Sequence, residues 1–209
     1  MAVLAGIVLF TSCENMFDNI IDKLTGNADA IVGRSGGGDA LEQEFTSSIV
    51  MFDKEANPQY AVGLSMTMDI EDLLSIDDVE DIQFPFLVYR VVCDNIKSGS
   101  SFTVENALTE ADLKDFDYQD LISGDFSENN LVGIAVSPTK FYIMKSGTVS
   151  LSKVNKTKMV GSFTGEAYLI NLDAEPMLEP ELVPMSGNFT SRITDLMKWL
   201  IKIQEKKGE

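Results

Sequence analysis

Two serines stand three residues before a lysine, a spacing that could place a nucleophile beside a base. They are Ser137 with Lys140 and Ser150 with Lys153. A serine nucleophile needs a neighbouring base to take its proton, and a lysine can act as that base. Pro138-Thr139, between the first pair, favours a turn between strands rather than the start of a helix. The spacing therefore lacks the local structure that catalysis would need, and we expect no enzyme activity.

The composition disfavours several other chemistries. The 209 residues include no histidine, which is the usual general base and a common metal ligand. The net charge of −17 leaves no basic surface for a phosphate backbone. The acidic stretch contains no Asp-x-Asp-x-Asp-Gly calcium loop, and apolar residues interleave with its carboxylates as in a solvated surface helix. We predict no metal site, no cofactor and no nucleic-acid partner. The acidic residues concerned are Asp69, Glu71, Asp72, Asp77, Asp78, Glu80 and Asp81, with Asp115, Asp117 and Asp120 further on.

The first thirteen residues carry a pattern for lipid attachment. Ala2 to Phe10 is an uncharged apolar run, far shorter than the roughly 20 residues that span a bilayer as a helix. It leads into Leu9-Phe10-Thr11-Ser12-Cys13, which resembles the lipobox of bacterial lipoproteins. The resemblance implies that Cys13 takes up a diacylglyceryl group and that residues 1–12 are removed as a signal peptide. Because Met1 to Ser12 contains no Lys or Arg, we expect a basic segment upstream of Met1.

The same resemblance implies where the protein resides. A lipid on Cys13 would hold it to a membrane of the cell envelope, and the expected location is the outer membrane or the cell surface. Residues 13–40 are expected to contain the lipidated cysteine, a short amphipathic segment over 16–24 and a glycine-rich tether. Residues 41–209 are then expected to form a β domain.

Alternating hydrophobicity predicts strands through much of that domain. Over Tyr60–Ile70 apolar residues alternate with small or polar ones, and Phe45–Phe52 is the expected hairpin partner. We expect Val62, Leu64, Met66 and Met68 on one buried face, with Phe163 and Phe189 nearby. Cys93 is expected to act as a small buried hydrophobe. The other predicted strands are Gln83–Cys93, Leu131–Ser137, Lys140–Lys145, Thr148–Val154, Met159–Leu172 and Val183–Ile193.

The predicted fold class is mainly β: an antiparallel β-sandwich with a short internal helix capped at Thr109 and a C-terminal helix from Asp195. A lipocalin-like barrel is the alternative. Gly161-Ser162-Phe163-Thr164 and Gly187-Asn188-Phe189-Thr190 repeat one pattern. A strand with Gly-x-Phe near the C-terminus resembles the β domains of many uncharacterised bacterial lipoproteins, which favours the β class.

These expectations lead to one function and two alternatives. We expect a lipid-anchored envelope lipoprotein that acts as a binding or structural module, with a protein or glycan partner that the sequence does not name. The first alternative is a carrier of a small apolar ligand inside a lipocalin-like barrel. The second is a hydrolase with two facing carboxylates. A large apolar cavity would favour the carrier, and a filled interior would favour the module.

Overall fold

The computed structural model describes residues 26–33, 40–68, 83–107, 130–171, 173 and 181–193. All the regular elements within these ranges are strands. The two predicted helices, near Thr109 and from Asp195, lie outside the described residues, as does Cys13. The strands are β1 (Asn27–Val32), β2 (Leu41–Phe45), β3 (Ser47–Asp53), β4 (Gln59–Met66), β5 (Phe86–Cys93), β6 (Ser101–Glu105), β7 (Leu131–Ser137), β8 (Lys140–Val154), β9 (Lys158–Asn171) and β10 (Glu181–Ile193).

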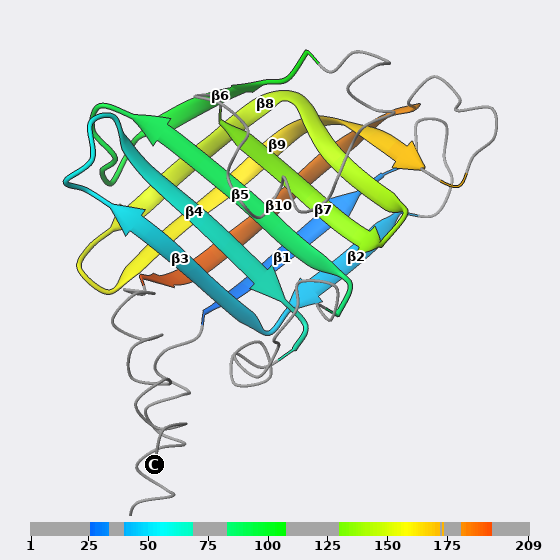
Figure 1. The fold of residues 1–209 in the computed structure, drawn as a ribbon, viewed down its shortest axis with the longest axis horizontal. Helices are drawn as coiled ribbons and strands as arrows, with labels where there is room; N and C mark the ends of the chain where they lie inside the picture. Colours follow the sequence, from blue (N-terminus) through cyan, green and yellow to red (C-terminus); the bar gives the residue numbers. More distant parts are fainter. Residues whose placement is uncertain are drawn as a thin grey trace, which may run out of the picture.

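Strand pairing forms a ring. Neighbours follow the order β3, β4, β5, β7, β8, β9 and β10, and β10 then returns to β3. That last contact is parallel and joins Arg192 and Ile193 to Ile49 and Val50, whereas every other pairing is antiparallel. In Figure 1, β3, β4, β5 and β7 form one layer, and β9, β10, β1 and β2 run in a different direction in the other. The predicted class, a mainly antiparallel β fold, is confirmed.

Strand β8 passes from one layer to the other. Its first residues pair with β7, and its later residues, from Ser146 to Ser150, pair with β6. The prediction of a break at Ser146-Gly147 is wrong, because the strand continues through a shift in register after Met144. Gly147 lies opposite Gly165, and a Cβ on Gly147 would come within 2.9 Å of the Gly165 Cα. The glycine therefore allows two backbones to approach closely, rather than making a turn.

The expected tether contains a strand of the sheet. β1 pairs with both β10 and β2, and Ala28, Ala30 and Val32 on it are buried. The domain boundary at residue 41 and the assignment of residues 27–32 to the tether are therefore wrong, since the β domain includes Asn27. The alternation of small apolar residues in β1 is short and lies beside glycines, which concealed it in the sequence.

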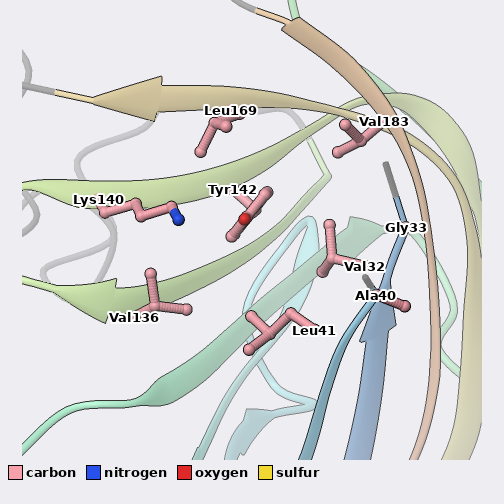
Figure 2. A pocket seen from close by; sticks show the side chains of 9 residues that line it. All are labelled: Val32, Gly33, Ala40, Leu41, Val136, Lys140, Tyr142, Leu169 and Val183. Carbon is pink, nitrogen blue, oxygen red and sulfur yellow. The ribbon is translucent and has the colours of Figure 1, made fainter. Parts of the chain in front are cut away.

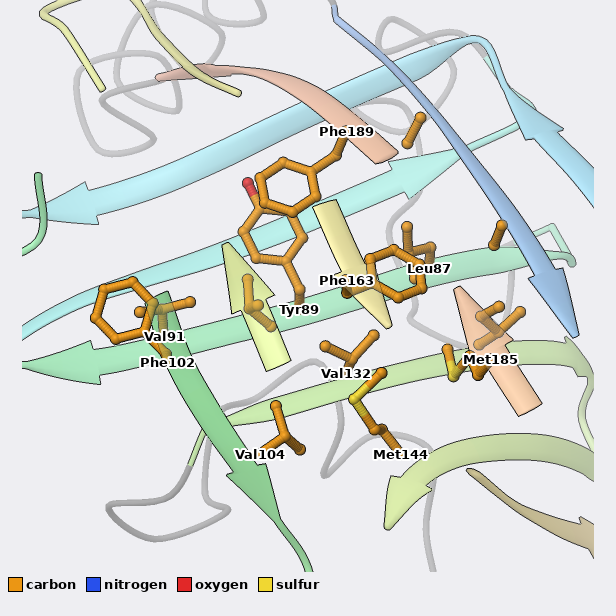
Figure 3. Close-up of a cluster of buried hydrophobic side chains, with 14 of the residues drawn as sticks. Leu87, Tyr89, Val91, Phe102, Val104, Val132, Met144, Phe163, Met185 and Phe189 are labelled. Carbon is orange, nitrogen blue, oxygen red and sulfur yellow. The ribbon is translucent and has the colours of Figure 1, made fainter. Parts of the chain in front are cut away.

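Aromatic rings and apolar side chains fill the space between the layers. Tyr89 and Phe189 stack with ring centroids 4.1 Å apart (Figure 3). The two Gly-x-Phe-Thr segments pair with each other, so that Gly161 lies opposite Phe189 and Gly187 lies opposite Phe163. In each pair the ring occupies the place where the glycine has no side chain. The repeat seen in the sequence is thus a matched pair of packing units.

The predicted β3–β4 hairpin is confirmed, and Met66 and Met68 are buried as expected. The prediction that Phe163 and Phe189 lie beside this face of β4 is wrong. Ala61, Gly63 and Ser65 face the filled interior, and the ring of Tyr89 covers Gly63. Val62, Leu64 and Met66 lie on the outer face instead, where Val62 and Leu64 are only half-buried. This outer apolar cluster does not include Phe163 or Phe189. Its buried members are Met66, Met68, Phe86, Val88, Leu131, Ala135, Phe141, Ile143 and Ile170.

Candidate functional site

Several residues with chemical potential lie outside the described ranges. Cys13 and the acidic positions Asp69–Asp81 are among them, as are Asp115, Asp117 and Asp120. Within the described ranges, no group of three potential metal ligands comes together. Cys93 is a free thiol and is only partly buried at the edge of the core, rather than fully buried as expected.

The two serine–lysine pairs lie on strands and a turn. Ser137 and Lys140 are paired across the β7–β8 turn, where the backbone N–H of Thr139 donates to Ser137 Oγ at 3.4 Å. Ser150 lies on β8, and its hydroxyl is 3.1 Å from that of Ser101. Neither serine opens a helix, which is the position that this type of nucleophile occupies. The local structure of both pairs is the one expected from the sequence.

A chain of buried hydroxyls joins four strands near the parallel closure of the ring. Ser48 Oγ lies 2.7 Å from Ser65 Oγ and 2.6 Å from Ser191 Oγ, and Tyr89 donates to Ser191 Oγ at 2.9 Å. Burial raises the pKa of Tyr89 well above its usual value, although the hydrogen bond with Ser191 opposes that shift. This row of hydrogen-bonded side chains contains only hydroxyls and no base. It therefore links the four strands by hydrogen bonds and does not activate a nucleophile. Sequence reasoning missed it because its members come from β3, β4, β5 and β10.

The outer face of the second layer carries short uncharged polar side chains in register. Strands β6, β8, β9 and β10 each contribute one residue to a serine row and one to a threonine row. Most of these side chains are exposed, and the others are half-buried. We call these eight residues the polar face. The serine row is Ser101, Ser150, Ser162 and Asn188, and the threonine row is Thr103, Thr148, Thr164 and Ser186.

The rows continue onto β1 and β2 with a different character. Asn188 and Asp29 are register partners, as are Asp29 and Glu44, so the serine row ends in two carboxylates. The Asp29 carboxylate accepts hydrogen bonds from the Asn188 backbone N–H at 2.9 Å and from Asn188 Nδ2 at 3.1 Å. The threonine row ends in Ile31, which is 45% exposed, and Glu42. At this end, the polar face is thus bordered by the carboxylates of Asp29, Glu42 and Glu44 and by the apolar side chain of Ile31.

Two neighbouring hollows lie along the serine row. One, of about 420 Å³, is lined by Ser101, Ser150 and Ser162, and the other, of about 520 Å³, by Asp29 and Glu44. Both are also lined by residues 188–190 of β10, so they adjoin one another. Together they give the polar face an extended shape that could hold an elongated polar ligand.

No protein-family model matches the chain, and neither the curated proteins nor the solved structures compared with it gave a match. Within the described part of the chain, no helix has the length and hydrophobicity needed to cross a membrane.

Proposed function

We propose that this chain is a lipid-anchored binding module of the bacterial cell envelope, and that its polar face binds a neutral polysaccharide. The observation that carries the proposal is the row structure of that face: eight aligned side chains, all hydroxyl or amide, none charged. Hydroxyl and amide groups both donate and accept hydrogen bonds, as the hydroxyls of a sugar do. The regular spacing of strands would repeat such contacts along a chain of sugar units.

Charge supports a neutral ligand over an ionic one. The eight residues supply no cation to hold phosphate, sulfate or carboxylate groups. Asp29, Glu42 and Glu44 at one end of the rows would repel an anionic polymer. Oriented carboxylates accept hydrogen bonds from sugar hydroxyls, and the exposed Ile31 offers an apolar contact for the C–H face of a ring.

The filled interior favours a module over a carrier with a central cavity. Tyr89, Phe163 and Phe189 lie in the middle of the interior and are nearly or fully buried. A middle packed in this way leaves no room for a central ligand without displacing side chains.

The lipid anchor completes the proposal and rests on the sequence alone. A diacylglyceryl group on Cys13 would hold the domain at a membrane surface. Cys13→Ala should release the protein into the soluble fraction while its circular dichroism spectrum is retained. Mass spectrometry of the native protein should find acyl chains on residue 13 and no residues 1–12. A mature chain that keeps those residues with an unmodified Cys13 would disprove the anchor.

Affinity electrophoresis tests the polysaccharide. Neutral polysaccharides, including dextran and a β-glucan, should be cast in native gels, and at least one should slow migration of the full chain. Asn188→Ala and Thr164→Ala should reduce that retardation, since each removes a hydrogen-bonding group from the polar face. Thr67→Ala, which alters an exposed threonine beyond the end of β4, is the matched control and should bind as the parent does. Retardation that Asn188→Ala and Thr67→Ala reduce equally would contradict the assignment, as would stronger binding to heparin.

A further inference from the structure

A separate pocket of about 300 Å³ opens at one end of the two layers, on the inner side of the strands (Figure 2). It lies where β1 and β7 end and where β2, β8 and β10 begin. Its walls are mostly aliphatic, in contrast to the polar face. The larger aliphatic wall residues are Val32, Leu41, Val136, Leu169 and Val183.

Tyr142 places a hydrogen-bonding group in this apolar pocket. The residue is only 8% exposed, and Figure 2 shows its ring among the wall side chains. No described residue forms a hydrogen bond with its hydroxyl. The hydroxyl oxygen is not among the buried side-chain atoms that lack a partner, so it keeps access to solvent in the pocket. The Tyr142 hydroxyl is therefore a donor available to a ligand.

Lys140 supplies a positive charge at the same site. It lies two residues before Tyr142 on β8, and its Nζ is 6.0 Å from the centroid of the Tyr142 ring. No carboxylate is among the described residues that line the pocket. The nearby Asp173 accepts a hydrogen bond from Thr139 at 2.8 Å. The chain as a whole has a net charge of −17. Lys140 gives this apolar pocket a local positive charge, which attracts an anionic head group.

We propose that the end pocket binds a small amphipathic carboxylate, such as a medium-chain fatty acid. The Tyr142 hydroxyl donates to one carboxylate oxygen, and Lys140 pairs with the negative charge. The hydrocarbon tail packs against Val32, Leu169 and Val183. A pocket of about 300 Å³ stands at the small end of the range for ligand sites, which favours a short tail over a membrane phospholipid. This site is independent of the polar face, and either could fail without the other.

Isothermal titration of the full chain with octanoate tests the proposal, with octan-1-ol and a short-chain phosphatidylcholine as competing probes. Octanoate should bind, octanol should bind more weakly, and the phospholipid should not bind. Tyr142→Phe keeps the ring and Lys140→Gln keeps most of the stem. Each should weaken octanoate binding by about tenfold, the usual effect of losing a hydrogen bond to a charged group. Val183→Phe should block the tail and abolish binding of both octanoate and octanol.

A second Lys–Tyr pair, away from the pocket, provides the control. Lys145 Nζ lies 5.5 Å from the Tyr168 ring centroid, and neither residue lines the pocket. Lys145→Gln should therefore leave octanoate binding unchanged. The proposal is overturned if octanoate does not bind at millimolar concentration, if Lys140→Gln and Lys145→Gln have equal effects, or if octanol binds as well as octanoate. Thermal melts of each variant would show that a loss of binding is not a loss of folding.

Discussion

The outer faces of the two layers differ, although both are built from strands whose side chains alternate between two faces. On β4, β5, β7 and the first part of β8, the outer face carries large apolar side chains such as Phe86, Val88 and Phe141, all essentially buried. On β6, the rest of β8, β9 and β10, the outer face carries the serine and threonine rows, most of them exposed. β8 belongs to both layers, and its outer side chains change from apolar to polar where it crosses. A period of two thus locates a strand without saying which set of residues faces the interior.

The largest effect should come from the apolar outer face. Phe86→Ala removes a ring that is 0% exposed, and should lower the free energy of unfolding by about 3–5 kcal/mol. Ser162→Ala, on the polar face, should change it by no more than about 0.5 kcal/mol. Urea denaturation followed by circular dichroism measures both. Equal effects of the two substitutions would abolish the contrast between the two outer faces.

A smaller effect should identify the inward face of β4. Gly63→Ala places a methyl group against the Tyr89 ring, which is stacked on Phe189 and hydrogen-bonded to Ser191. Such overpacking should cost about 1–3 kcal/mol in urea denaturation. The cost should fall in a Tyr89→Leu background, where the ring is absent, and this double-mutant cycle is the control. A cost that is the same in both backgrounds would place Gly63 elsewhere.

Alkaline titration should report on the same interior. Burial raises the pKa of Tyr89 above that of an unfolded tyrosine, which is about 10. The folded state therefore binds this proton more tightly. The contribution of Tyr89 to stability is fully present below about pH 10 and is lost as the pH rises beyond it. The loss should be roughly 1 kcal/mol over the first pH unit above 10. Tyr89→Phe should flatten this part of the profile, and an unchanged profile in that variant would show that another group causes the fall.

The smallest effect on stability should come from the threonine row. Thr148→Val combined with Thr164→Val keeps the side-chain shape and removes two hydroxyls from the outer face. Unfolding free energy should change by about 0.5 kcal/mol or less, while retardation by a neutral polysaccharide should be lost. A large change in stability with binding retained would mean that the row has a structural role instead.

Local sequence predicted most strands and few of the contacts between them. The extent of β7 was predicted in full because Leu131–Ser137 is an uncharged, mostly apolar run with a proline after it. The inward face of β4 could not be predicted, because its small residues fit there only when the Tyr89 ring arrives from β5. The end pocket could not be predicted either, since its wall residues come from widely separated strands. All such contacts depend on the pairing of strands that are distant in sequence, and no local sequence pattern predicts that pairing.

The pairing of Gly161 with Phe189 and of Gly187 with Phe163 has a consequence for how the chain finds its alignment. If β10 slid by two residues along β9, one ring would face the other ring, or one glycine the other glycine, leaving a clash or a void. The same slide would hardly change the contacts between the outer side chains, because these are small polar residues that are nearly interchangeable as neighbours. They are Ser162, Thr164, Ser186 and Asn188. Four inward residues therefore encode the alignment of the two strands, and this leaves the outward sequence free to change with whatever the surface contacts.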